Sequence, residues 1–192
     1  MRVRRLVRRW YWNHAAAWCI LFRQRALALR YYQKMLEQDP ADTLALASIG
    51  FRYAEAGRRQ EAFEMFERVL ALQPLDSEAH FNRGFLLQQG QDHLAAIAAF
   101  ERATELDAGH DRAWYGMGLS MIALRRFEDA VAPLKRNTKL QPMSPYGWYQ
   151  LARVQLDLGY REEAQRVLDH LMKFEPKVAR QLARETHLNL PE

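Results

Sequence analysis

The sequence predicts an all-α solenoid, in which pairs of helices repeat along the chain and a last helix caps the final pair. Two columns of small residues carry this prediction, because each recurs every 34 residues. The first column consists of Ala16, Gly50, Gly84, Gly118 and Ala152. The second column consists of Ala28, Ala62, Ala96, Ala130 and Ala164. Since both columns keep register without an insertion, we expect about five helix-turn-helix units of 34 residues.

The rest of each unit also agrees with two short helices. A large apolar residue follows each alanine of the second column after four positions, which is helical spacing. These residues are Tyr32, Phe66, Phe100, Leu134 and Leu168. A proline, which cannot continue a helix, closes four of the five units, at Pro40, Pro74, Pro142 and Pro176. Each unit is therefore predicted to consist of two helices, followed by a turn that ends the unit.

Turn and capping residues place the helices within the units. Gly57 and Gly159 mark turns between the two helices of a unit. Asp76 and Ser144 are suitable N-cap residues for first helices, and Pro145 suits the first helical position. The resulting organisation is a basic cap, five units and a capping helix with a tail, at residues 1–8, 9–42, 43–76, 77–110, 111–144, 145–178 and 179–192.

The composition agrees with a folded protein. The chain has 192 residues, of which 49% are hydrophobic and 27% are charged. A single cysteine, Cys19, excludes an intramolecular disulfide and a zinc site with several cysteines, and we expect it to be a buried thiol. No apolar run reaches 18 residues, so the sequence predicts no membrane-spanning helix.

The columns resemble the tetratricopeptide repeat (TPR). In that family's pattern Trp114, Gly118, Ala130 and Pro142 occupy matching positions of one unit, and the other units match in a similar way. The resemblance covers residues 9–178, and the first unit is degenerate because Arg23 replaces the glycine between its helices. It implies a right-handed superhelix, a concave groove lined by the first helices, and a non-catalytic protein-interaction function.

Carrying the family's groove positions onto this sequence gives a candidate peptide-binding set rich in aromatic, amide and arginine side chains. The set is Phe51, Phe81, Asn82, Phe85, Arg112, Tyr115, Tyr146, Tyr149 and Arg153. Such side chains are typical of binding surfaces, although packing against the next unit would also explain the aromatic members. The carboxylate clamp with which some TPR proteins bind chaperone tails is broken, because Ala47, Phe51 and Gly116 occupy its other positions.

No catalytic or cofactor-binding pattern accompanies the repeats. Only about twenty residues lie outside them, no glycine-rich phosphate loop occurs, and the six histidines are dispersed. Asp107, His110 and Asp111 could hold a metal by spacing, but a turn between repeats is usually polar. We therefore expect neither an enzyme nor a bound cofactor or metal.

Two residues depart from the repeat pattern. Arg83 stands where a leucine normally packs, so its guanidinium should be paired or reach solvent. Pro133 lies inside an expected second helix and should kink it. Structural compensation explains both departures.

The positive charge of the chain is concentrated at its beginning. Residues 1–36 hold eight Arg, one Lys and no acid, whereas the remaining 156 residues carry 19 basic and 23 acidic side chains. The first of these cations form a candidate basic surface, at Arg2, Arg4, Arg5, Arg8 and Arg9. Trp10, Tyr11, Trp12 and Trp18 lie between the cations; Trp12 is in repeat register and should be buried, while Trp10 and Tyr11 could contact lipid.

The basic segment permits more than one interpretation. It imitates a signal peptide, but Trp12, Ala16 and Ala28 keep the repeat register, which favours a retained first unit. Its charge would suit an anionic membrane surface or an acidic protein, with nucleic acid as the weakest of the three, and a merely solvated cap is an equal alternative.

Together these observations predict an interaction scaffold that binds an unidentified protein or peptide, of acidic character if Arg112 and Arg153 contact it. The alternative is a peripheral membrane or polyanion-associated scaffold that docks through its first unit. We expect the chain in the cytoplasm, including the inner face of a membrane, and the sequence leaves its oligomeric state open.

Overall fold

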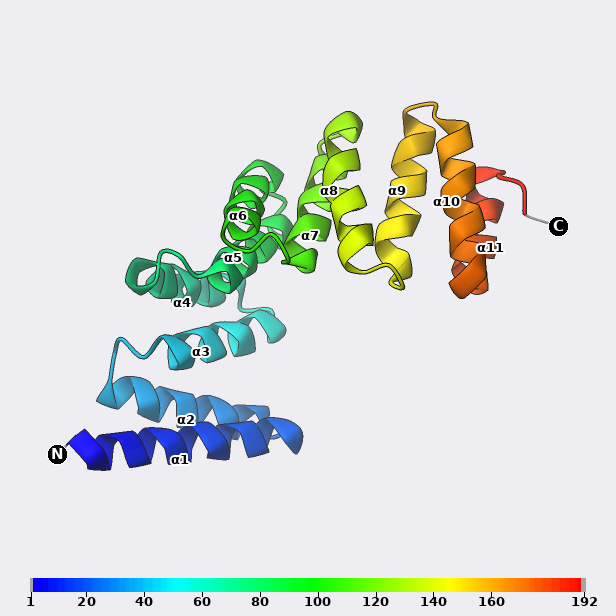
Figure 1. Ribbon diagram of the computed structural model, residues 1–192. Coiled ribbons are helices and arrows are strands. Elements are labelled where there is room, and N and C mark those ends of the chain that lie inside the picture. Colours follow the sequence, from blue (N-terminus) through cyan, green and yellow to red (C-terminus); the bar gives the residue numbers. More distant parts are fainter. Residues whose placement is uncertain (1, 191–192) are drawn as a thin grey trace. The chain divides into compact units, whose positions relative to one another are not determined.

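The computed structural model describes residues 2–190, with side chains from residue 6 onward, and within this range it contains helices and no strand (Figure 1). The helices are α1 (Arg2–Leu21), α2 (Arg25–Gln38), α3 (Thr43–Glu55), α4 (Arg59–Leu72), α5 (Ser77–Gln89), α6 (His93–Leu106), α7 (Asp111–Ala123), α8 (Phe127–Leu140), α9 (Pro145–Asp157), α10 (Arg161–Phe174) and α11 (Pro176–Thr186). The predicted all-α fold of helix pairs with a last capping helix is confirmed.

Helix starts repeat with the period of the sequence. First helices begin at residues 43, 77, 111 and 145, and second helices at 25, 59, 93, 127 and 161. The exception is α1, which begins at Arg2 and has 20 residues, whereas the other first helices have 13. The basic residues before Arg9 are therefore the first turns of α1 itself.

The chain divides into two compact units, one up to Leu86 and one from Leu87 onward. In the first unit, α1, α2 and α3 pack around Ala16, Ala28, Tyr32, Met35 and Ile49. Cys19 is buried beside them, as expected. Trp12 packs against the same cluster but is only partly buried, because it lies at the edge of the contact between the helices.

In the second unit, small residues permit close contact between the two helices of a pair. At Gly118 of α7, an added Cβ would lie 2.8 Å from two atoms of the Leu134 side chain of α8. Only glycine therefore fits at this contact without displacement of Leu134. Ala130 and Ala164 of the second alanine column are fully buried, and so is Leu182 of α11.

The turn inside every helix pair contains one residue in the left-handed backbone region. Its φ is positive at Gly57 (73°) and Gly159 (81°), as the glycines predicted. The same position in the other pairs holds residues with a side chain, namely Arg23 (59°), Gln91 (64°) and Arg125 (58°). The turn geometry is thus kept where the glycine is not, and each such residue carries the strain of that conformation.

Side chains of the helices hold the loops between successive pairs. Trp114 Nε1 donates to the carbonyl of Ala108 at 3.1 Å, and Trp148 Nε1 donates to that of Pro142 at 2.9 Å. Arg136 of α8 also donates to the Ala108 carbonyl, at 3.2 Å. These bonds satisfy carbonyls that the helix ends leave without a helical partner.

Capping is more uneven than the sequence predicted. Asp76 accepts a hydrogen bond from Ala79 N at 2.9 Å, as an N-cap residue does, and Asp92 accepts one from Ala95 N at 3.1 Å. Ser144 occupies the N-cap position of α9, as predicted, but its side chain makes no cap hydrogen bond. Pro145 occupies the first turn of α9, where its fixed φ helps to begin the helix without that bond.

The two residues that depart from the pattern are accommodated differently. The Nε of Arg83 lies 2.9 Å from Oε1 of Glu67, so the guanidinium is paired as expected, although the N–H does not meet hydrogen-bond geometry. Pro133 is buried inside α8, which continues from Phe127 to Leu140. The kink at Pro133 stays a prediction.

Candidate protein-binding surfaces

In the first unit, the candidate groove residues differ in accessibility. Phe51 of α3 and Phe85 of α5 are about two-fifths exposed, whereas Phe81 and Asn82 each expose only 7% of their surface. Phe81 stacks on Phe85 with ring centroids 6.3 Å apart, and Phe51 meets the edge of Phe66 at 6.5 Å. The accessible apolar surface of these helices is therefore provided by Phe51 and Phe85, which rest on buried aromatic rings.

In the second unit, α7 and α9 bring three of the candidate residues around one pocket. Arg112 and Tyr115 of α7 and Tyr146 of α9 line a cavity of about 290 Å³. The remaining lining residues are polar, and they include Asn137, Gln141 and Ser144. Asn137 is fixed by a hydrogen bond from its Nδ2 to the carbonyl of Asp111 at 3.0 Å. A pocket with aromatic walls, an arginine and amide groups can accept one side chain of a peptide.

Tyr115 is the most enclosed of these aromatic residues. Burial raises the pKa of its phenol above the ordinary value, partly offset by a hydrogen bond with Gln150. The phenol therefore stays neutral at physiological pH and serves as a hydrogen-bonding group at the wall of the pocket.

Tyr149 and Arg153 lie further along α9 and face the last helix. The Tyr149 hydroxyl donates to Oε2 of Glu185 on α11, and the guanidinium of Arg153 lies over the Tyr149 ring, 5.8 Å from its centroid. Burial and the neighbouring Glu185 raise the pKa of Tyr149, while the hydrogen bond from Tyr149 lowers that of Glu185. Tyr149 thus contacts the cation of Arg153 through its ring and the carboxylate of Glu185 through its hydroxyl.

The sequence did not identify Glu185 as part of this surface. Glu185 lies in the last helix, outside the 34-residue register, so no repeat position could be assigned to it. Since α11 packs against both α10 and α9, Glu185 contacts Tyr149, which lies 36 positions earlier in the chain.

At the other end of the chain, the candidate basic surface is only partly described. The side chains of Arg2, Arg4 and Arg5 lie outside the described residues, and Arg8 is exposed. Arg9 binds the carboxylate of Asp42 through two nitrogens, with Nη2 at 3.1 Å from Oδ1. Arg9 therefore attaches α1 to the start of α3.

Asp42 has two structural tasks. It accepts a hydrogen bond from Ala45 N at 3.2 Å, which caps α3, and it receives the guanidinium of Arg9. Burial alone would raise the pKa of this carboxyl, but the hydrogen bonds from Arg9 and from the backbone outweigh it and hold the pKa below the ordinary value. The carboxylate is accordingly charged at neutral pH.

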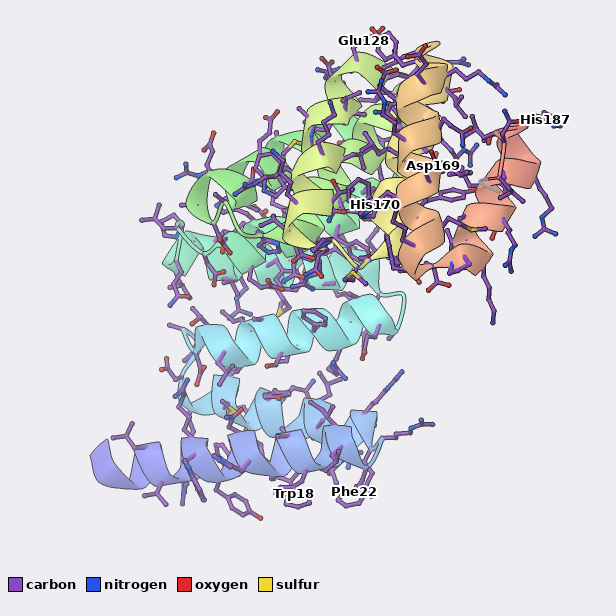
Figure 2. The ribbon with its side chains drawn as sticks, turned by 45° about the vertical axis from the view of Figure 1, so that its right-hand side comes forward. Trp18, Phe22, Glu128, Asp169, His170 and His187 are labelled. Carbon is purple, nitrogen blue, oxygen red and sulfur yellow. The ribbon has the colours of Figure 1, made fainter. Side chains whose placement is uncertain are left out.

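The aromatic residues of α1 divide between its two faces. Trp12 lies on the core side, whereas Trp10, Tyr11 and Trp18 are exposed to solvent. Trp18 and Phe22 stack with centroids 5.8 Å apart, and Figure 2 shows both projecting from α1 on the side away from α2.

Among the described residues, no three His, Cys, Asp or Glu side chains gather as metal ligands would. The spacing of Asp107, His110 and Asp111 has a structural explanation instead, because Asp107 Oδ1 accepts from Gly109 N at 2.8 Å within the turn. Along the same part of the chain, no helix combines the length and the apolar character needed to cross a membrane.

Comparison with known families and structures agrees with the repeat architecture. Sequence profiles described as tetratricopeptide repeat match residues 49–111, 86–145 and 145–178. None of the curated protein sequences matches the chain.

Several solved structures are similar to this fold. A crystal structure of MamA is 20% identical, covers 96% of this chain and 98% of its own, and gives a TM-score of 0.78. A MamA from Desulfovibrio magneticus RS-1, comprising residues 41 to the end, is 20% identical over 93% of this chain and 96% of its own, with a TM-score of 0.77. YrrB, described as a TPR protein with an unusual peptide-binding site, is 21% identical over 90% of each chain, with a TM-score of 0.74.

Proposed function

The chain belongs to the tetratricopeptide repeat family, and on this premise we propose that it is a non-catalytic scaffold that binds a partner peptide on its first helices. The observation that supports the proposal most directly is the pocket shared by Arg112, Tyr115 and Tyr146 on two successive first helices. Packing within a helix pair does not require an arginine and two tyrosines at these positions. They provide the anchors that peptide-binding surfaces use.

The side chains around this pocket suggest the chemistry of the ligand. An apolar or aromatic side chain would enter the pocket between Tyr115 and Tyr146, and the exposed Gln141 offers an amide group to the peptide backbone. A carboxylate of the ligand would meet Arg112 at the pocket or Arg153 beside Tyr149. The proposed ligand is therefore a short peptide with an anchoring side chain and an acidic residue. The peptide-binding site of YrrB, a protein of similar fold, supports this class of ligand.

The test begins with a displayed peptide library that is selected on the full chain, followed by measurement of the Kd of the selected peptide. Replacement of Tyr115 and Tyr146 by Ala should weaken binding by at least about tenfold, because each removes an aromatic wall of the pocket. Tyr115→Phe keeps the ring and should retain most of the affinity. Tyr160→Ala removes an exposed tyrosine of the same unit outside the pocket and serves as the matched control.

Two results would contradict the proposal. In the first, the double alanine variant binds the selected peptide as well as the original chain does. In the second, it loses about 3–5 kcal/mol of stability, which is the effect of truncating a core aromatic residue and would show that these rings only pack. Circular dichroism and thermal unfolding of each variant distinguish the two.

The second candidate function is docking of the first unit to an anionic membrane or another polyanion. It is favoured by the exposed aromatic side chains of α1 together with the absence of acidic residues before Glu37. Flotation with anionic vesicles at low and high salt is the simplest test, and parallel titration with DNA distinguishes a membrane from nucleic acid.

A further inference from the structure

We propose that α1 is an interfacial membrane helix, which lies in the plane of an anionic lipid surface with one apolar face toward the acyl chains. The proposal deepens the second candidate function and does not depend on peptide binding by α7 and α9.

The apolar face follows from helical spacing. Val7, Trp10 or Tyr11, His14, Trp18 and then Leu21 or Phe22 are three or four residues apart, so they form one stripe along the helix. The core side of α1 carries Ala16 and Cys19, which are buried, and Trp12, which packs against the first core cluster. The stripe therefore points away from the protein.

The stripe is exposed along its whole length. The exposed fraction is between 56% and 70% for Val7, Trp10, Tyr11, Trp18, Leu21 and Phe22. Elsewhere in the described chain, large exposed apolar side chains such as Leu94, Met143 and Tyr160 occur on different elements. Scattered apolar residues are ordinary on a protein surface, whereas a contiguous row of this size marks an interaction site.

The charge around the stripe selects its occupant. Exposed arginines stand near both ends of α1, with Arg8 in its early turns and Arg23 and Arg25 just beyond its last one. No acidic residue occurs before Glu37. Arginine at the level of the headgroups, with Trp and Tyr at the boundary and apolar side chains below, is the arrangement of helices that lie in a lipid interface. The 20 residues of α1 extend for about 30 Å, so the contact involves many lipids.

The same charges argue against the other occupants. A symmetric contact between two copies would bring their arginines together without an acid to neutralise them. Nucleic acid would satisfy the arginines and leave the apolar stripe in water. A transmembrane orientation would place Asn13, His14 and the early arginines in hydrocarbon, and α1 is not apolar enough to span a bilayer. An in-plane orientation at an anionic surface satisfies both the charge and the apolar face.

The experiment uses the full chain with vesicles of phosphatidylcholine, with and without phosphatidylglycerol, at low and high salt. We expect the original chain to float with the anionic vesicles, to lose most of its binding in high salt, and to show a blue shift of tryptophan emission on binding. The variant Trp18→Ser with Leu21→Ser should reduce the partition coefficient by about tenfold or more, because two large apolar side chains no longer enter the lipid.

Matched variants separate insertion, charge and folding. Leu94→Ser with Tyr160→Ser removes two exposed apolar side chains of the second unit and should leave vesicle binding unchanged. Arg8→Gln and Arg25→Gln should each weaken binding by about fivefold, the factor for one cation near an anionic surface. Arg9→Gln should lower the melting temperature and change vesicle binding less than Arg8→Gln does, because Arg9 is paired with Asp42.

Other outcomes would overturn the proposal. Salt-dependent binding that Trp18→Ser with Leu21→Ser leaves unchanged would show a purely electrostatic contact. Self-association that this variant abolishes, without vesicle binding by the original chain, would identify the stripe as an interface between copies. Failure to bind any vesicle would show a solvated face. None of these outcomes affects peptide binding, so failure of the Tyr115 and Tyr146 test remains a separate result.

Discussion

The first and last helices of the described chain, α1 and α11, both bury an inner face but differ in the side chains of their outer face. The outer face of α11 is polar, with exposed Lys177, Arg180 and Arg184, while its inner face buries Leu182 and Ala183. The outer face of α1 carries the apolar stripe, although its inner face is buried equally well around Ala16. A helix face that is left in water is normally polar, as the outer face of α11 is, whereas a contiguous exposed apolar row such as that of α1 is typical of a contact surface. The difference agrees with the proposed lipid contact of α1.

The largest expected effect is the loss of stability on truncation of Leu182 in α11, with Leu21 of α1 as the comparison. Leu182→Ala should lower the free energy of unfolding by about 2–5 kcal/mol, because Leu182 is fully buried and its truncation leaves a cavity. Leu21→Ala should change it by less than about 0.5 kcal/mol, because the Leu21 side chain is 70% exposed. Urea unfolding followed by circular dichroism measures both. Equal effects would mean that the two helices are packed alike and would remove the contrast.

The next effect concerns the attachment of α1. Asp42→Asn removes the charge that Arg9 binds and weakens the N-cap of α3, so we expect a loss of about 1–2 kcal/mol at neutral pH. Because the folded pKa of Asp42 is lowered, its contribution is complete above the unfolded pKa of about 3.9 and is lost as the pH falls toward the folded value. The difference in stability between the original chain and the variant should therefore shrink below about pH 4. A difference that persists there would contradict the role of the charge.

A smaller effect concerns the segment after α11. Gln165 donates from Nε2 to the carbonyl of Asn189 at 2.7 Å and accepts from Asn189 N at 3.1 Å. Gln165→Ala should cost about 1 kcal/mol, the usual net value of such hydrogen bonds. Amide hydrogen exchange should accelerate at Asn189 and leave α1 unaffected. Unchanged exchange at Asn189 would show that Leu188, which is buried, holds this segment without Gln165.

The smallest effect compares turns in the two units. Arg23→Gly and Arg125→Gly relieve the left-handed strain, worth about 1–2 kcal/mol, but glycine also increases the entropy of the unfolded chain by about 0.4–1 kcal/mol. We expect a net gain of about 0–1 kcal/mol for each, visible as a small rise in melting temperature. Gly159→Ala, as the reverse change, should lower it. The guanidinium of Arg125 lies over the Phe127 ring, 5.9 Å from its centroid, so a net loss at Arg125→Gly would show that this contact outweighs the relief of strain. A net loss at Arg23→Gly would contradict the expected gain.

The periodic part of the fold could be predicted because it depends on local spacing. The columns that contain Ala96 and Gly118 predict where the two helices of a unit meet. Each unit needs a small residue at that contact, whatever the other units do. That Tyr115 and Tyr146 lie close together could also be predicted, because both occupy the same repeat frame, whereas peptide binding there stays a prediction. The cap position of Ser144 was predicted as well, but not that its side chain makes no cap hydrogen bond.

The remaining contacts join residues without a shared frame. Arg9 is 33 residues from Asp42, and a run of arginines does not show which one meets a buried carboxylate. Glu185 is 36 residues from Tyr149 and belongs to a helix outside the repeats. Both pairs depend on how a terminal helix docks, which is decided by packing rather than by a sequence period. The exposure of the apolar stripe of α1 could not be predicted for the same reason. From the sequence, its apolar residues could equally have packed against a neighbouring helix.

The uniform 34-residue period has a mechanical consequence. Successive pairs are in contact through α2 and α3, through α6 and α7, and through α8 and α9, so a force applied along either unit should detach one pair while its neighbour stays folded. Each pair that detaches releases about 34 residues, or roughly 110–120 Å of extended polypeptide. Because Arg9 of α1 binds Asp42 at the start of α3, detachment of the first pair should also require that this ion pair breaks.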